Sequence, residues 1–153
     1  MKPGKKTDRC GRIKAVEREY QVAELARDAL EDALTHHSGL LTAGGLTAVD
    51  LRTYRSKLHD TYFIRLFAEF ETGLKDYWTK GLGKDPRTRI MDVIDSVAAK
   101  HPRIIDAWRI NVHAARRYRN HLIHEEDAEA VSVTVTDARR YLGRFFGCLP
   151  ENW

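Results

Sequence analysis

The sequence predicts an all-α protein, a helical bundle of four main helices followed by a short C-terminal helix. The chain has 153 residues but only 10 Gly and 4 Pro, so long segments run without either residue. Within these segments apolar residues recur every three or four positions, which is the spacing of one helix face. A hydrophobic content of 42% with 31% charged residues fits one globular domain with its own core.

The first two helices are predicted from apolar stripes that end near glycine. Residues 1–11 are basic and contain glycine and proline, so we predict a disordered basic tail and a single domain over residues 12–150. The first helix is expected over residues 12–37. The second is expected over residues 47–80, is on the order of 50 Å long, and opens on a capping pattern that places Asp50 in its first turn.

The later helices are shorter and are separated by proline or polar residues. A polar break at residues 127–129 precedes residues 131–135, where apolar and polar side chains alternate as in a short extended segment. The three helices are expected over residues 85–101, 102–124 and 136–149, with Asp85 and Thr136 as N-caps.

Composition limits the function classes. The formal charge of +4 allows an anionic partner such as RNA. No apolar run approaches the roughly 18 residues of a membrane span, and no apolar stretch follows the basic N-terminus, so we expect neither a membrane anchor nor a secretory signal. Cys10 and Cys148 form no zinc-ligand spacing, and unpaired thiols fit a reducing compartment. We therefore expect a cytoplasmic protein without a metal site or cofactor.

Side chains that can bind phosphate or transfer protons are most concentrated in residues 116–124, which hold three arginines and two histidines. Arginine presents a planar fork of donors that matches phosphate oxygens. Histidine can take or give a proton near neutral pH. Metal-free RNA cleavage needs these functions: a base for the ribose 2′-OH, an acid for the leaving 5′-oxygen, and positive charge on the phosphorane.

One arginine in this stretch occupies an apolar position. The apolar steps of the fourth predicted helix run from Ile105 through Val112 and Ala115, and the same rule next reaches Arg119 and then Leu122. A guanidinium aimed at a core seam is costly unless it is paired or faces a crevice. Spacing alone does not select a catalytic pair, because an arginine-rich chain produces many by chance. The candidate pairs are Arg116 with His121, Arg119 with His124, Arg117 with His124, and Arg52 with His59.

Residues 119–124, with the sequence RNHLIH, resemble the R-x4–6-H motif of the HEPN superfamily. In that family a polar residue, often Asn, follows the arginine, and the motif lies near the end of a late helix. Residues 67–75 also look like the family's second helix. The acidic residues 125–127 depart from the family, in which a small residue often follows the histidine.

The resemblance implies an antiparallel, up-and-down bundle and an endoribonuclease that acts as a homodimer, possible roles being those of a toxin or an antiviral defence effector. Arg119 would then bind the scissile phosphate, His124 would be the general base or acid, and Asn120 would position one of them. The partners implied are RNA, a second copy of the chain, and an antitoxin or a nucleotidyltransferase. Arg116, Arg117 and His121 match no fixed family position, and we predict that they contact RNA.

Helix geometry favours the same dimer. Five helical steps separate Arg119 from His124, so their side chains point about 140° apart and lie about 7.5 Å apart along the axis. Two such helix ends that face each other would bring both arginines and both histidines onto one crevice. Two alternatives stay open. The chain is a non-catalytic HEPN-like module that binds nucleotide, RNA or a protein, or Arg119 and His124 belong to a buried polar network that locks helices or subunits together.

Overall fold

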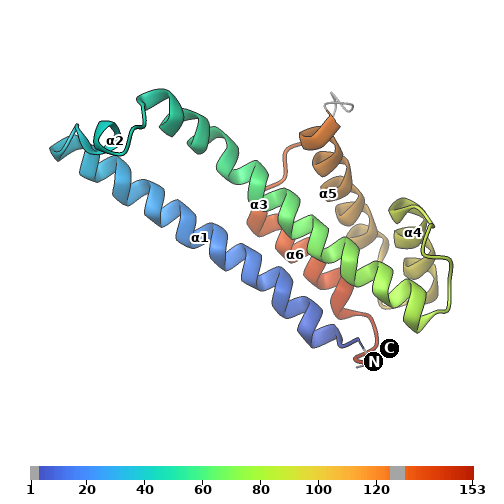
Figure 1. Cartoon of the computed structure of the whole chain (residues 1–153). Coiled ribbons are helices and arrows are strands. Elements are labelled where there is room, and N and C mark those ends of the chain that lie inside the picture. Colours follow the sequence, from blue (N-terminus) through green and yellow to red (C-terminus); the bar gives the residue numbers. More distant parts are fainter. Residues whose placement is uncertain (1–3, 125–129) are drawn as a thin grey trace.

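The computed structural model describes residues 4–124 and 130–153, and within these two ranges the chain is helical (Figure 1). No strand occurs among the described residues, so the predicted all-α class is confirmed. The polar break and the acidic run predicted within residues 125–129 lie outside the described ranges. The elements are α1 (Lys6–His36), α2 (Leu40–Ala43), α3 (Ala48–Asp76), the π-helical turn η1 (Tyr77–Gly81), α4 (Ile90–Lys100), α5 (Asp106–His124) and α6 (Val135–Gly147).

Helix α1 begins at Lys6, well before the predicted start at residue 12. The reason lies near the C-terminus, because the backbone N–H of Lys6 donates to the carbonyl oxygen of Glu151 at 2.9 Å. The N–H of Thr7 donates to the Glu151 carboxylate at 3.2 Å. The N–H groups of a first helical turn lack partners inside their helix, and Glu151 supplies the acceptors. The prediction of a disordered tail is therefore wrong for residues 6–11.

Helix α3 is the long central helix that the sequence predicts. At its start the N–H of Asp50 donates to the Thr47 hydroxyl at 3.3 Å, and the N–H of Thr47 donates to the Asp50 carboxylate at 2.8 Å, which confirms the capping pattern. Farther along, Gly73 faces α6. A Cβ atom at Gly73 would lie 2.9 Å from the ring of Phe146, so only glycine lets the two helices approach this closely.

Two of the following helices begin later than predicted because a turn precedes each. The side chain of Asp85 accepts the N–H of Arg87 at 2.8 Å and closes a local turn, so α4 begins at Ile90 rather than at residue 85. A second turn follows Pro102, and α5 begins at Asp106. In both cases the side chain or proline that the sequence assigns to a helix start belongs to the turn before it.

The last helix begins earlier than predicted. The hydroxyl of Thr134 accepts the N–H of Asp137 at 3.0 Å, so Thr134 is the N-cap of α6 in place of Thr136. Residues 131–135, predicted as an extended segment, contain no strand, and the last of them is already helical. The helix ends at Gly147, two residues before the predicted end.

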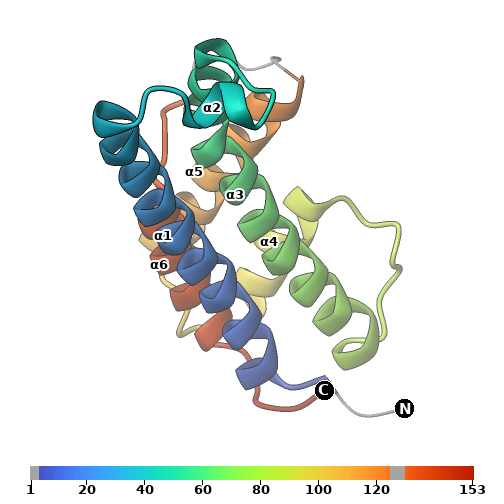
Figure 2. The same ribbon diagram turned by 60° about the vertical axis from the view of Figure 1, so that its left-hand side comes forward.

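The core lies where α1, α3, α5 and α6 meet, and α4 packs against α3 and α5 (Figure 2). Among the described helices, none combines the length and the apolar character that crossing a membrane requires. The centre of the core is aromatic and is made by Phe63, Phe67, Phe70, Phe145 and Phe146, all of which are buried.

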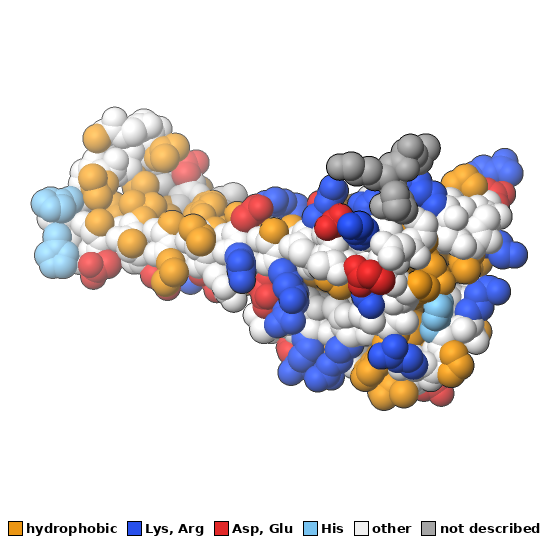
Figure 3. All heavy atoms as spheres, turned by 90° about the horizontal axis from the view of Figure 1, so that it is seen from below, with side chains coloured by type: hydrophobic (Ala, Val, Ile, Leu, Met, Phe, Trp, Pro, Cys, Tyr) orange, Lys and Arg blue, Asp and Glu red, His pale blue; other side chains and the backbone are white. Residues whose placement is uncertain are grey.

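Residues 22–57 form a two-helix arm, made of the second half of α1, the short α2 and the first part of α3. The arm projects beyond the other helices (Figure 1) and carries hydrophobic side chains along its surface (Figure 3). Val22, Leu25 and Val49 are 65%, 70% and 62% exposed. Tyr54, which lies in the apolar stripe of the second predicted helix, is 43% exposed. Among the described residues no third helix covers the arm, so this part of the stripe is not buried within the single chain.

Candidate functional site

The predicted site lies on the C-terminal half of α5, where the buried seam of this helix runs through Val112, Ala115 and Tyr118. Tyr118 is 8% exposed and takes the apolar position that the pattern assigns to Arg119, whereas Ile105, the predicted start of the stripe, is 50% exposed. The steps along the seam are three and three instead of three and four. Arg119 therefore lies beside the seam, where it is half-buried.

Arg119 is held by its neighbour in the sequence. Its Nη1 atom donates a hydrogen bond of 3.1 Å to the side-chain oxygen of Asn120. The Nε atom of Arg119 is buried and has no hydrogen-bond partner among the described residues. A buried donor without a partner costs free energy. The guanidinium is thus oriented by Asn120, and its Nε donor is closed to solvent.

His124 is the last described residue of α5, and its side chain is exposed. It takes part in no hydrogen bond, ion pair or ring contact with the described part of the chain. Because α5 is helical as far as His124, the side chains of Arg119 and His124 point about 140° apart around the helix axis. A single chain does not bring these two predicted catalytic residues together.

The exposed face of α5 instead carries Arg117, His121 and His124. These residues are spaced by four and then three positions, which places them on one side of a helix. Arg117 and His124 are exposed, and His121 is half-buried. Arg117 with His124 is also one of the candidate pairs found by spacing. Two arginines are therefore candidate partners of His124. Arg117 lies on the same face of α5 as His124, and Arg119 lies on the opposite side.

The two halves of α5 differ in whether carboxylates pair with their cationic side chains. In the N-terminal half, Arg109 and His113 contact the Asp95 carboxylate at 3.0 Å and 2.8 Å. Burial raises the pKa of Asp95, but the bonds from His113 and Arg109 outweigh it and lower that pKa overall. In the C-terminal half, Arg117, Arg119 and the two histidines have no carboxylate partner among residues 4–124 and 130–153. Within these ranges, the charges of Arg117 and Arg119 are therefore not compensated by a carboxylate.

His121 borders a cluster of aromatic rings between α3 and α5. Its ring stacks on Tyr118 with centroids 6.5 Å apart. Tyr118 meets the edge of Phe63 at 4.8 Å and lies 6.1 Å from the ring of His59. The Nδ1 atom of His121 is buried and lacks a hydrogen-bond partner within the described ranges. These contacts give His121 a place in the packing between helices, in addition to the RNA contact predicted for it.

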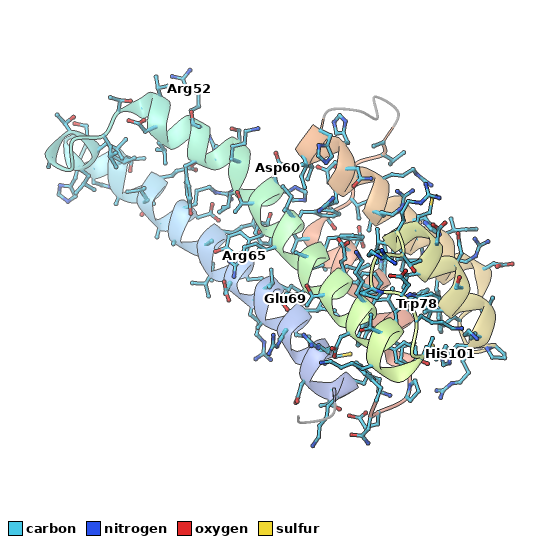
Figure 4. All side chains as sticks on the ribbon, turned by 45° about the vertical axis from the view of Figure 1, so that its right-hand side comes forward. Arg52, Asp60, Arg65, Glu69, Trp78 and His101 are labelled. Atoms are coloured by element: carbon cyan, nitrogen blue, oxygen red, sulfur yellow. The ribbon has the colours of Figure 1, made fainter. Side chains whose placement is uncertain are left out.

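The neighbours that α3 contributes were not predicted. Figure 4 shows Asp60 on α3 beside the C-terminal end of α5. The Nδ1 atom of His59 lies 3.4 Å from the carboxylate of Asp60. Sequence spacing identified His59 only as half of a chance pair with Arg52, because the periodicity of one helix does not show which residues of another helix face it. An acidic side chain and a third histidine therefore lie near the predicted site.

The described residues contain no group of three or more His, Cys, Asp or Glu side chains that could hold a metal ion. The polar side-chain atoms of the predicted site residues are those of guanidinium, amide and imidazole groups, which suit an anion better than a cation. Comparisons with protein-family models, with curated proteins and with solved structures found no match for this chain.

Proposed function

We propose that this chain is a metal-independent endoribonuclease of the HEPN type, with an antiparallel up-and-down bundle and a site shared across a homodimer. Arg119, Asn120 and His124 are its catalytic residues. The observation that carries this proposal is the half-buried guanidinium of Arg119, which Asn120 orients at 3.1 Å and which has no carboxylate partner among the described residues. A fixed donor aimed at developing negative charge is the main requirement for stabilising a phosphorane.

In the proposed reaction the imidazole of one His124 takes the proton of the ribose 2′-OH, and the 2′-oxygen attacks the phosphorus. The bond from phosphorus to the 5′-oxygen breaks, and the leaving oxygen takes the proton that His124 accepted, so one His124 serves first as base and then as acid. Arg119 donates to the phosphorane oxygens. The products are a 2′,3′-cyclic phosphate and a 5′-hydroxyl end.

The proposed dimer is supported by two features of the single chain. Arg119 and His124 point away from each other around α5, so the site is incomplete until a second copy supplies the missing partner. The arm also exposes Val22, Leu25 and Val49, and apolar side chains exposed on two packed helices are typical of an interaction surface. We propose that the arm packs against the second copy.

The alternative function is a module that binds RNA without cleaving it. It is favoured by His124, which has no hydrogen-bond partner in the described part of the chain to orient its ring. General bases are commonly oriented by a third group. The same cations would then bind phosphate, and binding would weaken steeply as salt is added.

One assay separates these functions. The protein is incubated with RNA in EDTA, and the ends of any fragments are identified. The enzyme proposal expects 2′,3′-cyclic phosphate ends, lost in Arg119→Ala and in His124→Ala while circular dichroism shows both variants folded. Retention of RNA without fragments supports the binding module. Fragments that persist unchanged in both variants would mean that the site is elsewhere.

A further inference from the structure

A second concentration of positive charge lies in a groove between α6 and α1, on the side of α6 away from α5. The groove has a volume of about 420 Å³, which is within the range of ligand-binding pockets. Figure 3 shows Lys and Arg side chains gathered beside α1 on this face of the molecule. The side chains that line the groove include Ile13, Lys14, Arg139, Arg140, Gly143 and Arg144, with four cations and no carboxylate among them.

Two of these cations have partners and two do not. The Nε atom of Arg139 donates to the Glu17 carboxylate at 2.9 Å, and Arg140 donates to Asp137 at 2.6 Å. The side chains of Lys14 and Arg144 are exposed and make no ion pair or hydrogen bond with the other described residues. The groove therefore presents two uncompensated positive charges beside two that are already oriented by carboxylates.

The shape of the groove fits a polyanion. A Cβ atom added at Gly143 would meet no other atom within 4 Å, so the surface between Arg139 and Arg144 is open to an incoming group. Arginine forks match phosphate oxygens in two-bond geometry. No aromatic side chain lines the groove, so it offers no platform on which bases could stack. The chemistry favours a phosphate backbone over nucleobases.

We propose that this groove binds the phosphodiester backbone of RNA, as a site separate from the end of α5. The choice of RNA over another polyanion rests on the proposed function. Because backbone contacts do not read sequence, the groove would hold RNA of any sequence and leave the choice of cleavage position to the site on α5. Helix α6 packs against both α1 and α5, so it connects the two regions.

The test measures binding of a fluorescent 2′-O-methyl RNA, which cannot be cleaved because its 2′-oxygen is blocked. The groove variant is Lys14→Glu with Arg144→Glu. The matched control is Lys84→Glu with Lys100→Glu, which changes the net charge equally at exposed positions outside the groove. The groove variant should bind at least about tenfold more weakly than the control, and the slope of log affinity against log salt should fall by about two.

Equal binding by the groove and control variants would overturn the proposal, and so would competition by polyglutamate as effective as that by unlabelled RNA. Both mutated side chains are exposed, and Lys14→Gln with Arg144→Gln repeats the test if the reversal variant unfolds. The outcome is independent of cleavage. If wild-type protein cuts no RNA but the groove variant loses binding, the groove stands and the nuclease proposal fails. If Arg119→Ala abolishes cleavage but the groove variant binds as the control does, only the groove proposal fails.

Discussion

The Nη1 atom of Arg119 donates a hydrogen bond of 3.1 Å to the side-chain oxygen of Asn120, the next residue on α5. This bond fixes one side of the guanidinium, while its Nε atom stays buried without a partner among the described residues. Orientation of this kind matters for catalysis, because a misplaced group loses much of its effect on the transition state. Asn120 thus has a role that can be tested apart from binding.

Asn120→Ala should lower kcat for RNA cleavage by about 10- to 100-fold with little change in KM, because Arg119 remains but is no longer oriented. The matched control is Asn111→Ala, which removes the same amide from the same helix. Steady-state kinetics on a short RNA would measure both. An equal loss in the two variants would show that Asn120 has no special relation to Arg119.

Arg119→Ala should reduce cleavage by about 10²- to 10³-fold, the usual effect of losing one donor to a transition-state anion. Arg117→Ala removes an exposed arginine from the face that carries His124 and should cost much less. Single-turnover cleavage rates compare the two. If Arg117→Ala is the more damaging change, the catalytic pair is Arg117 with His124.

A second substitution at Arg119 distinguishes a catalytic side chain from a structural lock. Among the described residues, the one hydrogen bond of the Arg119 side chain is to Asn120 on the same helix, so Arg119→Met should lower Tm only slightly. Arg139→Met breaks a bond to Glu17, which is 8% exposed, and should cost about 2 kcal/mol because a charged acceptor loses its donor. For a chain of this size that is about 4 to 8 °C in Tm. A larger loss in Arg119→Met than in Arg139→Met would favour the lock.

His101 should make the stability of the fold depend on pH. Its Nε2 atom lies 2.8 Å from the Tyr77 hydroxyl, and burial, with a smaller effect of Lys100, lowers the pKa of His101 below 6.5. The unfolded chain therefore binds this proton at a higher pH than the folded chain does. The stability is fully present above pH 6.5 and is lost as the pH falls through 6.5 and then through the folded pKa.

Urea unfolding at pH 7 and pH 5 measures this effect. The free energy of unfolding should fall more in wild-type protein than in His101→Gln, which cannot be protonated there. His37→Gln, at an exposed histidine beyond the end of α1, should behave as wild type. A fall of the same size in all three proteins would assign the pH dependence to other groups.

The arm should control oligomeric state. Val22→Lys with Leu25→Lys places two charges on its exposed apolar surface and should convert the proposed dimer to a monomer, because unpaired charges oppose burial. Cleavage should be lost with the dimer. Ile110→Lys is the control, since Ile110 is 55% exposed but lies on α5. Sedimentation at low protein concentration measures the oligomeric state. If the variant with both arm substitutions is still a dimer, the interface lies elsewhere.

The helices were predictable because their apolar stripes and the capping pattern of Thr47 and Asp50 act locally. The errors arise where tertiary contacts decide. Helix α1 starts early because Glu151, from the other end of the chain, caps it. Near the site, the spacing placed Arg119 on the apolar seam, but Tyr118 fills that position and Arg119 lies beside it. Nothing in a periodic pattern identifies His59, because its relation to the site comes from the packing of α3 on α5.

The most direct test of the shared site is a mixing experiment with Arg119→Ala and His124→Ala. Neither variant alone has both groups, but their heterodimer pairs an intact Arg119 from one protomer with an intact His124 from the other. We expect both variants to be inactive alone and RNA cleavage to return on mixing, to a fraction of the wild-type rate set by the proportion of heterodimer. Failure of the mixture to cleave RNA, under conditions where subunits exchange and wild-type protein is active, would contradict a site shared between two chains.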